Sequence, residues 1–315
     1  MSPRAVQHLC IAGFRDILHI VSRRSGFHRI LFAVNGSQHS TAAVGVVAAI
    51  AGKSHSEVLV VHVWSPNDTV LQHDDELSRR RSGDPDVRAV VERLHAAGVE
   101  AVGESHGATS ESVAAFIASR ADTFDADLIA LGNRGLSELH TFLIGSRTQQ
   151  VLLQATRPVL AVRNVKPSLR SGIRRVVLVL DGSRDDESIV HAGIDIAQPA
   201  AAGVEVIDFG NRSDRWIGVV ASHLAKHGVS HTWRRVRDGG HAADEILAAV
   251  QNTRTDLLVI GATQSRLRSR LAPGLTAKLL QSCPCPLLVA PARELSKTRF
   301  TPLGAAASGT PRHVT

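Results

Sequence analysis

The sequence has no tyrosine, and aromatic residues make up only 3% of its 315 positions. Base-stacking surfaces of the kind that bind single-stranded nucleic acid are therefore scarce. The three cysteines form neither a CxxC pair nor an even set, which argues against a zinc module and against a secreted disulfide scaffold. No apolar run reaches the roughly 18 residues that a membrane-spanning helix needs. We expect a cytoplasmic protein without a transmembrane segment.

The composition is otherwise that of a globular protein, with 43% hydrophobic and 21% charged residues. At about 100 to 200 residues per domain, the length fits two domains. Lys and Arg exceed Asp and Glu by a net charge of +7, which favours anionic partners. Because the arginines are scattered along the chain, we expect solvated surfaces and no specific nucleic-acid partner. A nucleotide, which is also an anion, stays a candidate ligand.

The chain repeats itself. The run HRILFAVNGSQHS (28–40) matches RRVVLVLDGSRDD (174–186), so in both places an apolar strand ends in Asn/Asp-Gly-Ser before a helical pattern. Two further pairs follow in the same order, DADLIALGNRG (125–135) with RTDLLVIGATQ (254–264), and TRPVLAVR (156–163) with PCPLLVAP (284–291). A repeat of this period predicts two copies of one structural unit.

Within each copy, short apolar runs alternate with longer helical patterns. Runs that are apolar throughout indicate strands that are buried on both faces of a sheet. With helices between them, such strands favour an α/β fold with two tandem, doubly wound, parallel five-stranded sheets of Rossmann-like type. The expected strands are 30–34, 58–63, 99–102, 128–131 and 159–162 in the first copy, and 176–180, 204–207, 231–236, 257–260 and 287–289 in the second.

These patterns divide the chain into five parts. An amphipathic helical extension (1–27) precedes the first repeat (28–163), and a polar linker (164–173) leads to the second repeat (174–292). The tail (293–315) has no periodicity, and we expect it to be disordered. For the extension, we favour packing on its own domain, or a start codon placed too early, over a helix that binds a membrane surface or a partner.

Several features of the first repeat converge at the carboxyl ends of the strands, where open α/β sheets bind ligands. Asn35-Gly36-Ser37 follows the first strand, and Val61 lies near the end of the second. The stretch GNRGLSELHTFLIGS then follows a strand and opens a helix. Its glycines let backbone N–H groups turn toward phosphate oxygens, and a serine at a helix start favours an anion. This stretch predicts a phosphate site at Gly132, Gly135, Gly145 and Ser146, with Arg134 and Arg147 either pairing with phosphate or solvated.

At these residues the sequence resembles the universal stress protein family, specifically its tandem members with two domains in one chain. The resemblance covers 28–163 and 174–291 and depends on the NGS and DGS strand ends, the G-x2-G-x9-G-S pattern and the closing TRPVLAV strand. It implies a fold like that of the adenine nucleotide alpha hydrolases and ATP as ligand, with or without Mg²⁺. It also implies that the two repeats pair as an internal pseudo-dimer through their closing strands, while homodimerisation stays open.

Carried over from the family, Asn35 and Val61 would contact adenosine, and Gly132, Gly135, Gly145 and Ser146 would hold the phosphates. Asn35 stands where the family has Asp, which keeps an acceptor but removes a negative charge. In the second repeat Gln264 and Leu275 depart from the family pattern. We therefore expect a weaker or empty second site, formed by Asp181, Gly182, Ser183, Val206, Gly261, Gly274 and Thr276.

Taken together, these patterns favour an ATP-binding protein in which the nucleotide is a regulatory ligand held mainly by the first repeat. Two alternatives stay open, a slow ATPase or nucleotidyl-transfer enzyme that uses the same pocket, and a nucleotide-free stress scaffold. No positioned carboxylate pair or histidine near the glycine pattern indicates a general base, so we expect at most weak ATP hydrolysis.

Two other groups are interpreted as structural. Cys283 and Cys285 lead into an apolar strand, and we expect them to be packing residues rather than redox residues. His223 and His227 are four residues apart on an expected helix, where an exposed helix face is favoured over half of a metal site. No metal ligands are predicted.

Overall fold

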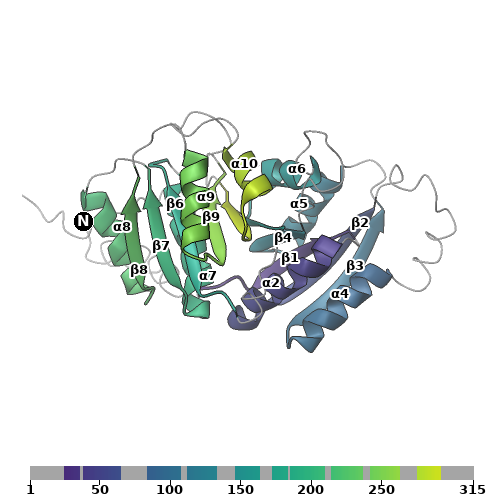
Figure 1. Ribbon diagram of the computed structural model, residues 1–315. Helices are drawn as coiled ribbons and strands as arrows, with labels where there is room; N and C mark the ends of the chain where they lie inside the picture. The colour runs from purple at the N-terminus through teal and green to yellow at the C-terminus, as the bar shows by residue number, and fades with distance from the viewer. Residues whose placement is uncertain are drawn as a thin grey trace, which may run out of the picture.

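The computed structural model describes residues 25–35, 38–64, 84–107, 112–132, 146–163, 172–183, 185–209, 214–236, 242–262 and 275–291. Within these ranges strands and helices alternate along both repeats (Figure 1). The first repeat contains β1 (Arg29–Val34), α2 (Gln38–Ser54), β2 (Glu57–Trp64), α4 (Pro85–Ala96), β3 (Glu100–Gly107), α5 (Val113–Thr123), β4 (Leu128–Gly132), α6 (Ser146–Gln154) and β5 (Val159–Val162).

The second repeat runs through the same kinds of element. It contains β6 (Arg175–Leu180), α7 (Asp186–Ala200), β7 (Gly203–Asp208), α8 (Asp214–Lys226), β8 (His231–Arg235), α9 (Ala242–Asn252), β9 (Leu257–Gly261), α10 (Leu275–Ser282) and β10 (Leu287–Ala290). All ten strands expected from the sequence are present, with ends that differ by a few residues at most except in β3, which extends to Gly107. The doubly wound α/β fold is confirmed.

The strands form one ten-stranded sheet in the order β3-β2-β1-β4-β5-β10-β9-β6-β7-β8 (Figure 1). Neighbouring strands within each repeat are parallel. At the centre β5 and β10 pair antiparallel, so the two five-stranded halves are joined edge to edge. The expected pairing of the closing strands is confirmed. It removes the two inner sheet edges, which would otherwise expose unpaired backbone groups.

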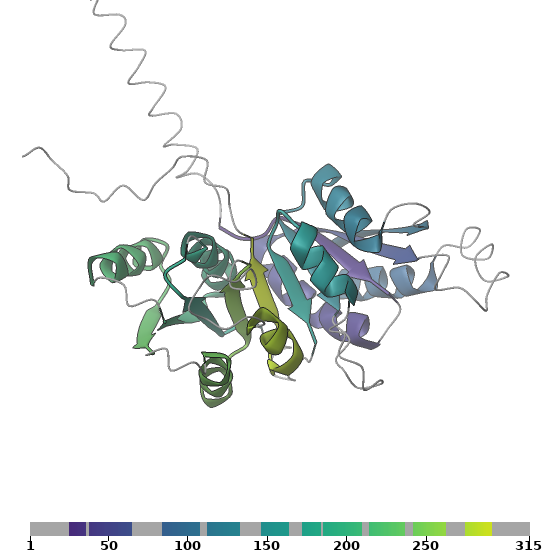
Figure 2. The same cartoon turned by 90° about the horizontal axis from the view of Figure 1, so that it is seen from above.

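Helices cover both faces of this sheet (Figure 2). On one face α2, α4, α7 and α8 pack on a single apolar cluster that runs through both repeats. On the other face the cluster under α5 and α6 is separate from the cluster under α9 and α10. The two outermost strands, β3 and β8, lie at the edges of the sheet, and nearly all of their residues are exposed or half-buried. The prediction that every strand is buried on both faces of the sheet is therefore wrong for β3 and β8.

Two aspartates make the same contact in the two repeats. The Asp127 carboxylate accepts the backbone N–H groups of His28 (2.8 Å) and Arg29 (3.1 Å). Asp256, its counterpart in the second repeat, accepts those of Arg174 (2.9 Å) and Arg175 (3.0 Å). Each carboxylate thus holds the start of the first strand of its repeat (β1 or β6) next to the start of the fourth strand (β4 or β9). This contact supports the internal repeat independently of the sequence match.

The start of the first repeat is tied to the second repeat. Phe27, which the sequence analysis placed in the extension, is buried in the cluster that both repeats share. The Gly26 N–H donates to Asp195 Oδ1 on α7 over 3.1 Å. The rest of the predicted extension (1–24), most of the linker (164–171) and the predicted tail lie outside the described residues. Among the helices that are described, none combines the length and apolarity required to cross a membrane.

Candidate functional site

The first repeat changes winding direction between β1 and β4. β1 is hydrogen-bonded to β2 on one side and to β4 on the other, with Ala33 opposite Leu131. The chain leaves β1 for a helix on one face and leaves β4 for a helix on the other, so the segments that follow these strands diverge. Such a switch point is where open α/β sheets leave room for a ligand at the carboxyl edge. Asn35 directly follows β1 and Gly132 ends β4, so the structure brings these two predicted residues to the same place.

Only some of the residues predicted to bind phosphate lie in the part of the chain that the structure describes. Helix α6 begins at Ser146, the position at which the sequence places the start of the anion-binding helix. The backbone of Ser146 and Arg147 therefore forms the first turn of α6, while their side chains are not described. Gly36, Ser37, Arg134, Gly135 and Gly145 lie outside the described residues.

Val61 lies inside the sheet and not at its rim. It pairs with Ala33 of β1 and Glu104 of β3, and its side chain is 0% exposed in the cluster covered by α5. β2 continues for three more residues, to Trp64. The adenosine contact that the family resemblance assigns to Val61 stays a prediction, and the geometry restricts it to the strand backbone because the side chain is fully packed.

The sequence analysis missed a buried hydrogen-bond network beside the same strand. His62 of β2 contacts Asp84 through Nδ1 and Oδ2 at 2.6 Å, and the Ser105 hydroxyl of β3 donates to the same oxygen over 3.1 Å. The other oxygen, Asp84 Oδ1, accepts the N–H groups of Asp86 and Val87 and so caps α4. The Asp-Pro pair at positions 84 and 85 is a helix-start signal that could have revealed the cap.

This network keeps Asp84 charged. Burial by itself would raise the pKa of Asp84, but the hydrogen bond from His62 and its electrostatic attraction, with the Asp86 N–H and the Ser105 hydroxyl, lower the pKa to about 2. His62, Asp84 and Asp86 offer ligand atoms within 4.8 Å of one another, a spacing that could hold a metal ion. Both Asp84 oxygens already accept hydrogen bonds, however, so the arrangement is that of a helix cap joined to two strands.

At the corresponding switch point of the second repeat, between β6 and β9, aspartate side chains accept hydrogen bonds from nearby backbone N–H groups. Asp186 accepts the N–H groups of Asp181 (3.2 Å, through Oδ1) and Gly182 (3.1 Å, through Oδ2). The Ser183 N–H donates to Asp181 Oδ1 over 2.9 Å, and the Asp185 N–H donates to Ser183 Oγ over 3.2 Å. The backbone donors at this strand end therefore have partners within the chain.

Asp185 closes the space beside β9. Its side chain is so near Gly261 that a Cβ at that glycine would come within 2.6 Å of Asp185 Cβ, and Asp185 is 1% exposed. Of the other predicted second-site residues, Val206 is buried in the core and Thr276 is buried in the first turn of α10. Gln264 and Gly274 lie outside the described residues.

With this geometry in view, a model of the universal stress protein family matches residues 26–163 and 216–291. The chain belongs to the universal stress protein family. The first match covers the β1–β4 switch point and the whole G-x2-G-x9-G-S stretch. The second match begins within α8, so it does not include the Asp181–Asp186 segment.

Individual members of the family resemble one or both repeats. The chain is 34% identical over 140 residues to the "universal stress protein in QAH/OAS sulfhydrylase 3′ region" of Thermus aquaticus, which covers 44% of this chain and 99% of that protein. It is 27% identical over 194 residues to a universal stress protein of Mycolicibacterium smegmatis, which covers 56% of this chain and 62% of the relative. A crystal structure of an Archaeoglobus fulgidus universal stress protein shares the fold over 84% of this chain and 98% of its own, with a TM-score of 0.65 and 18% identity.

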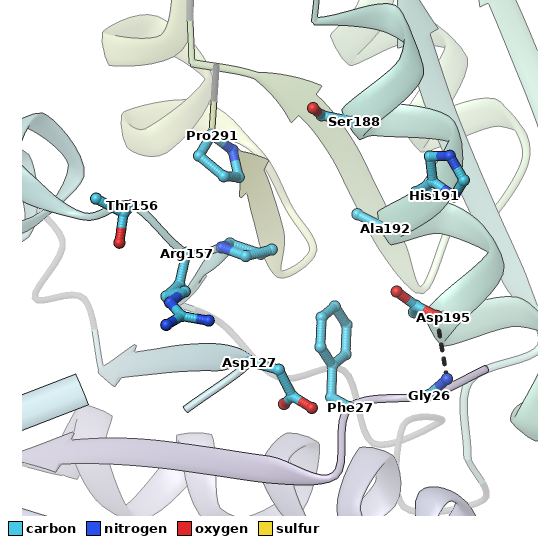
Figure 3. A pocket seen from close by; sticks show the side chains of 11 residues that line it. Gly26, Phe27, Asp127, Thr156, Arg157, Ser188, His191, Ala192, Asp195 and Pro291 are labelled. Atoms are coloured by element: carbon cyan, nitrogen blue, oxygen red, sulfur yellow. Dashed lines mark hydrogen bonds between the residues drawn. The ribbon is translucent and has the colours of Figure 1, made fainter. Parts of the chain in front are cut away.

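A separate hollow of about 340 Å³ lies between the two universal stress repeats (Figure 3). Phe27, Asp127 and Arg157 border it from the first repeat, while His191 and Asp195 border it from α7. The first three residues precede or adjoin the starts of strands, so the hollow lies at the opposite sheet edge from Asn35 and Gly132. It is therefore not the site that the sequence predicts.

His223 of α8 and His227, which directly follows α8, are half-buried and so differ from the expected exposed helix face. The His223 ring lies 5.2 Å from the His191 ring and 4.9 Å from the His227 ring, and His227 Nδ1 is 3.4 Å from Ser25 Oγ. Burial lowers the pKa of His223, helped by the charges of His227 and Lys226. Burial and Lys226 likewise lower the pKa of His227. The rings of His191, His223 and His227 therefore pack together between α7 and the end of α8, next to Ser25 just before the first repeat.

Proposed function

We propose that this universal stress protein binds an adenine nucleotide, ATP, at the switch point of its first repeat and uses it as a regulatory ligand. The observation that carries the proposal is the adjacency of Asn35 and Gly132 at the carboxyl ends of β1 and β4. The family match over 26–163 supports the identity of the ligand, because the resemblance implies ATP.

The helix that follows supports a phosphate at this edge. The first N–H groups of an α-helix lack partners within the helix, and the helix dipole adds partial positive charge there. α6 begins at Ser146, the last residue of the glycine pattern, and a serine at that position can add a hydroxyl contact. A polyphosphate lying between the end of β4 and the start of α6 would meet both sets of donors.

Asn35 supports a nucleotide held by hydrogen bonds rather than through a metal. An amide oxygen can accept a bond from a ribose hydroxyl, as the family's aspartate would, but it carries no charge to attract Mg²⁺. ATP binding here would therefore depend less on the divalent cation than in a site with an aspartate. This dependence is measurable by comparing ATP affinity with and without Mg²⁺.

The second repeat is proposed to hold no nucleotide. Asp186 already accepts the N–H groups of Asp181 and Gly182, and a phosphate placed near them would face carboxylates. The sequence match pairs Asp185 and Asp186 with His39 and Ser40 of the first repeat. The second repeat has therefore replaced two residues without negative charge by two aspartates at its switch point.

The test is a binding stoichiometry with a matched pair of variants. Titration calorimetry of the full chain with ATP is expected to give one site per chain. Gly135→Glu places a carboxylate in the glycine pattern of the first repeat, and it is expected to weaken ATP binding at least tenfold, or about 1.4 kcal/mol. Gln264→Glu makes the corresponding change in the second repeat and is expected to leave ATP binding unchanged.

Different outcomes would separate the competing functions. Two equivalent sites, or equal effects of the two variants, would contradict the asymmetry. Absence of ATP binding, together with no adenine nucleotide released from freshly purified and denatured protein, would favour a nucleotide-free scaffold. Binding that is abolished by Gly135→Glu while circular dichroism stays unchanged would support the proposal.

A further inference from the structure

Two thiols of the second repeat lie in contact. Cys283 follows the last residue of α10 and Cys285 comes two residues later, and their Sγ atoms are 3.4 Å apart. Each residue is 3% exposed and no disulfide joins them. Both belong to the apolar cluster beneath α9 and α10. Neither cysteine lines the hollow between the repeats.

The local fold holds the thiols together. The Cys283 N–H still donates to Leu279 O over 2.8 Å, as in a helix, whereas Pro286 O already accepts from Leu258 of β9 over 3.0 Å. The chain therefore turns from helix to strand within a few residues, with a bend at Pro284 and Cys285. A disulfide needs an S–S distance of about 2.05 Å. The Sγ atoms, 3.4 Å apart, must therefore approach one another further for the bond to form.

The first repeat shows that the fold does not require this pair. The matched stretches place Arg157 where the second repeat has Cys285, and Ala155 where it has Cys283. Arg157 borders the hollow (Figure 3). It also forms ion pairs with Asp122 (3.7 Å) and Asp125 (3.5 Å). The same turn therefore forms with one alanine and one charged side chain. Two contacting thiols are a particular property of the second repeat.

We propose that Cys283 and Cys285 form a reversible dithiol–disulfide couple whose oxidant is a low-molecular-weight disulfide. One cysteine thiolate attacks the small disulfide, whose S–S bond breaks and releases one small thiolate. The second cysteine thiolate attacks the protein sulfur of the mixed disulfide, which forms the Cys283–Cys285 bond and releases the second small thiolate. In total the two cysteine thiols lose two electrons and two protons. The small disulfide takes up the electrons as its S–S bond breaks, and its two thiolates take up the protons.

Burial and contact act on different steps of this reaction. Because both thiols are buried, the first attack requires local opening at the end of α10, a helix of eight residues. The second attack needs no further encounter, since the resolving sulfur already lies in contact. The mixed disulfide should therefore close internally before a second small molecule arrives. The proposal does not rest on nucleotide binding in the first repeat.

The experiment uses the full chain with Cys10→Ser, which leaves Cys283 and Cys285 as the only thiols. The native protein is incubated with glutathione disulfide, unreacted thiols are blocked with iodoacetamide in denaturant, and the peptide is examined by mass spectrometry. The expected product lacks two hydrogens and carries neither glutathione nor a blocking group. Dithiothreitol should restore both blockable thiols. Cys283→Ser and Cys285→Ser are expected to retain one glutathione each.

Three results would overturn the proposal. One is a native peptide that still carries two blocking groups after the reaction has reached a plateau. Another is a peptide with two glutathiones, which would show that the neighbouring sulfur does not resolve the mixed disulfide. The third is an internal bond that forms in urea-unfolded protein but not in native protein, because the contact of the folded state would then play no part.

Discussion

Leu160 of β5 lies directly opposite Leu288 of β10, and the two residues occupy the same position in their repeats. Their neighbours are exchanged across the pair, since Ala161 pairs with Leu287, the counterpart of Val159, and Val159 pairs with Val289, the counterpart of Ala161. An antiparallel pairing in which the central residue faces its own counterpart and the flanking residues are exchanged is what a two-fold axis produces between identical subunits. The covalent chain therefore builds an internal pseudo-dimer around this pair.

The first prediction concerns this pair. Leu160 and Leu288 are both 0% exposed and belong to the cluster shared by the two repeats. Leu160→Ala and Leu288→Ala should each lower the free energy of unfolding by about 2 to 5 kcal/mol, because each leaves a cavity in a packed core. Urea unfolding followed by circular dichroism measures the change. Leu153, which is 54% exposed, provides the control, and Leu153→Ala should cost far less.

Similar losses of unfolding free energy for Leu160→Ala and Leu288→Ala would reflect the symmetry of the pair. A loss confined to one variant would show that the two repeats do not contribute equally to the β5–β10 contact. A cost for Leu153→Ala as large as that of the buried leucines would contradict the burial argument altogether.

The strand arrangement could be predicted because most strands carry their own signal. Continuous apolar runs located the inner strands, and the repeat located the second unit, whereas the edge strands β3 and β8 carry no such run. Side-chain networks gave no such signal. Asp84 and His62 are 22 residues apart along the chain, and only the β2-to-α4 geometry brings them to 2.6 Å. The carboxylate contacts at the second switch point were equally hidden, because Asp185 and Asp186 resemble an ordinary charged helix start.

The second prediction tests the Asp84 network. Asp84→Ala removes the cap of α4 and leaves His62 and Ser105 without their shared acceptor, so stability should fall by about 2 to 4 kcal/mol. Asp84→Asn keeps a capping oxygen and should cost less. Because the pKa of Asp84 is lowered to about 2, its stabilising effect is present above its ordinary pKa of 3.8 and is lost as the pH falls toward 2.

Urea titrations at several pH values check both parts of this prediction. The difference in stability between the wild type and Asp84→Ala should shrink as the pH falls from about 5 to about 2. A difference that stays constant over this range would show that the charge of Asp84 does not contribute.

The third prediction follows from His223 and His227. The pKa values of His223 and His227 are lowered in the folded protein, so the folded state binds fewer protons than the unfolded state. Their contribution to stability is then present above the ordinary histidine pKa of about 6.5 and is lost as the pH falls below it. Melting temperature, measured from pH 8 to about pH 5, should therefore decrease toward acid.

A variant isolates the histidine contribution from other acid effects. His223→Gln removes the central ring, which contacts both His191 and His227. The melting temperature of this variant should depend less on pH than that of the wild type over the same range. An unchanged pH dependence would assign the acid sensitivity to groups other than this cluster.

The fourth prediction places a carboxylate in the first repeat at the position that Asp186 occupies in the second. Asp186 satisfies two backbone N–H groups at its switch point, and the sequence match gives Ser40 as its counterpart. If a carboxylate there substitutes for the anionic ligand, Ser40→Asp should weaken ATP binding at least tenfold, or about 1.4 kcal/mol. Ser40→Asn has a similar size without the charge, and it should weaken binding much less. Calorimetry at low and high salt separates the charge effect, since salt screens it. Equal losses for the Asp and Asn variants would mean that size rather than charge excludes the nucleotide, and an unaffected Ser40→Asp would place the phosphates away from this strand end.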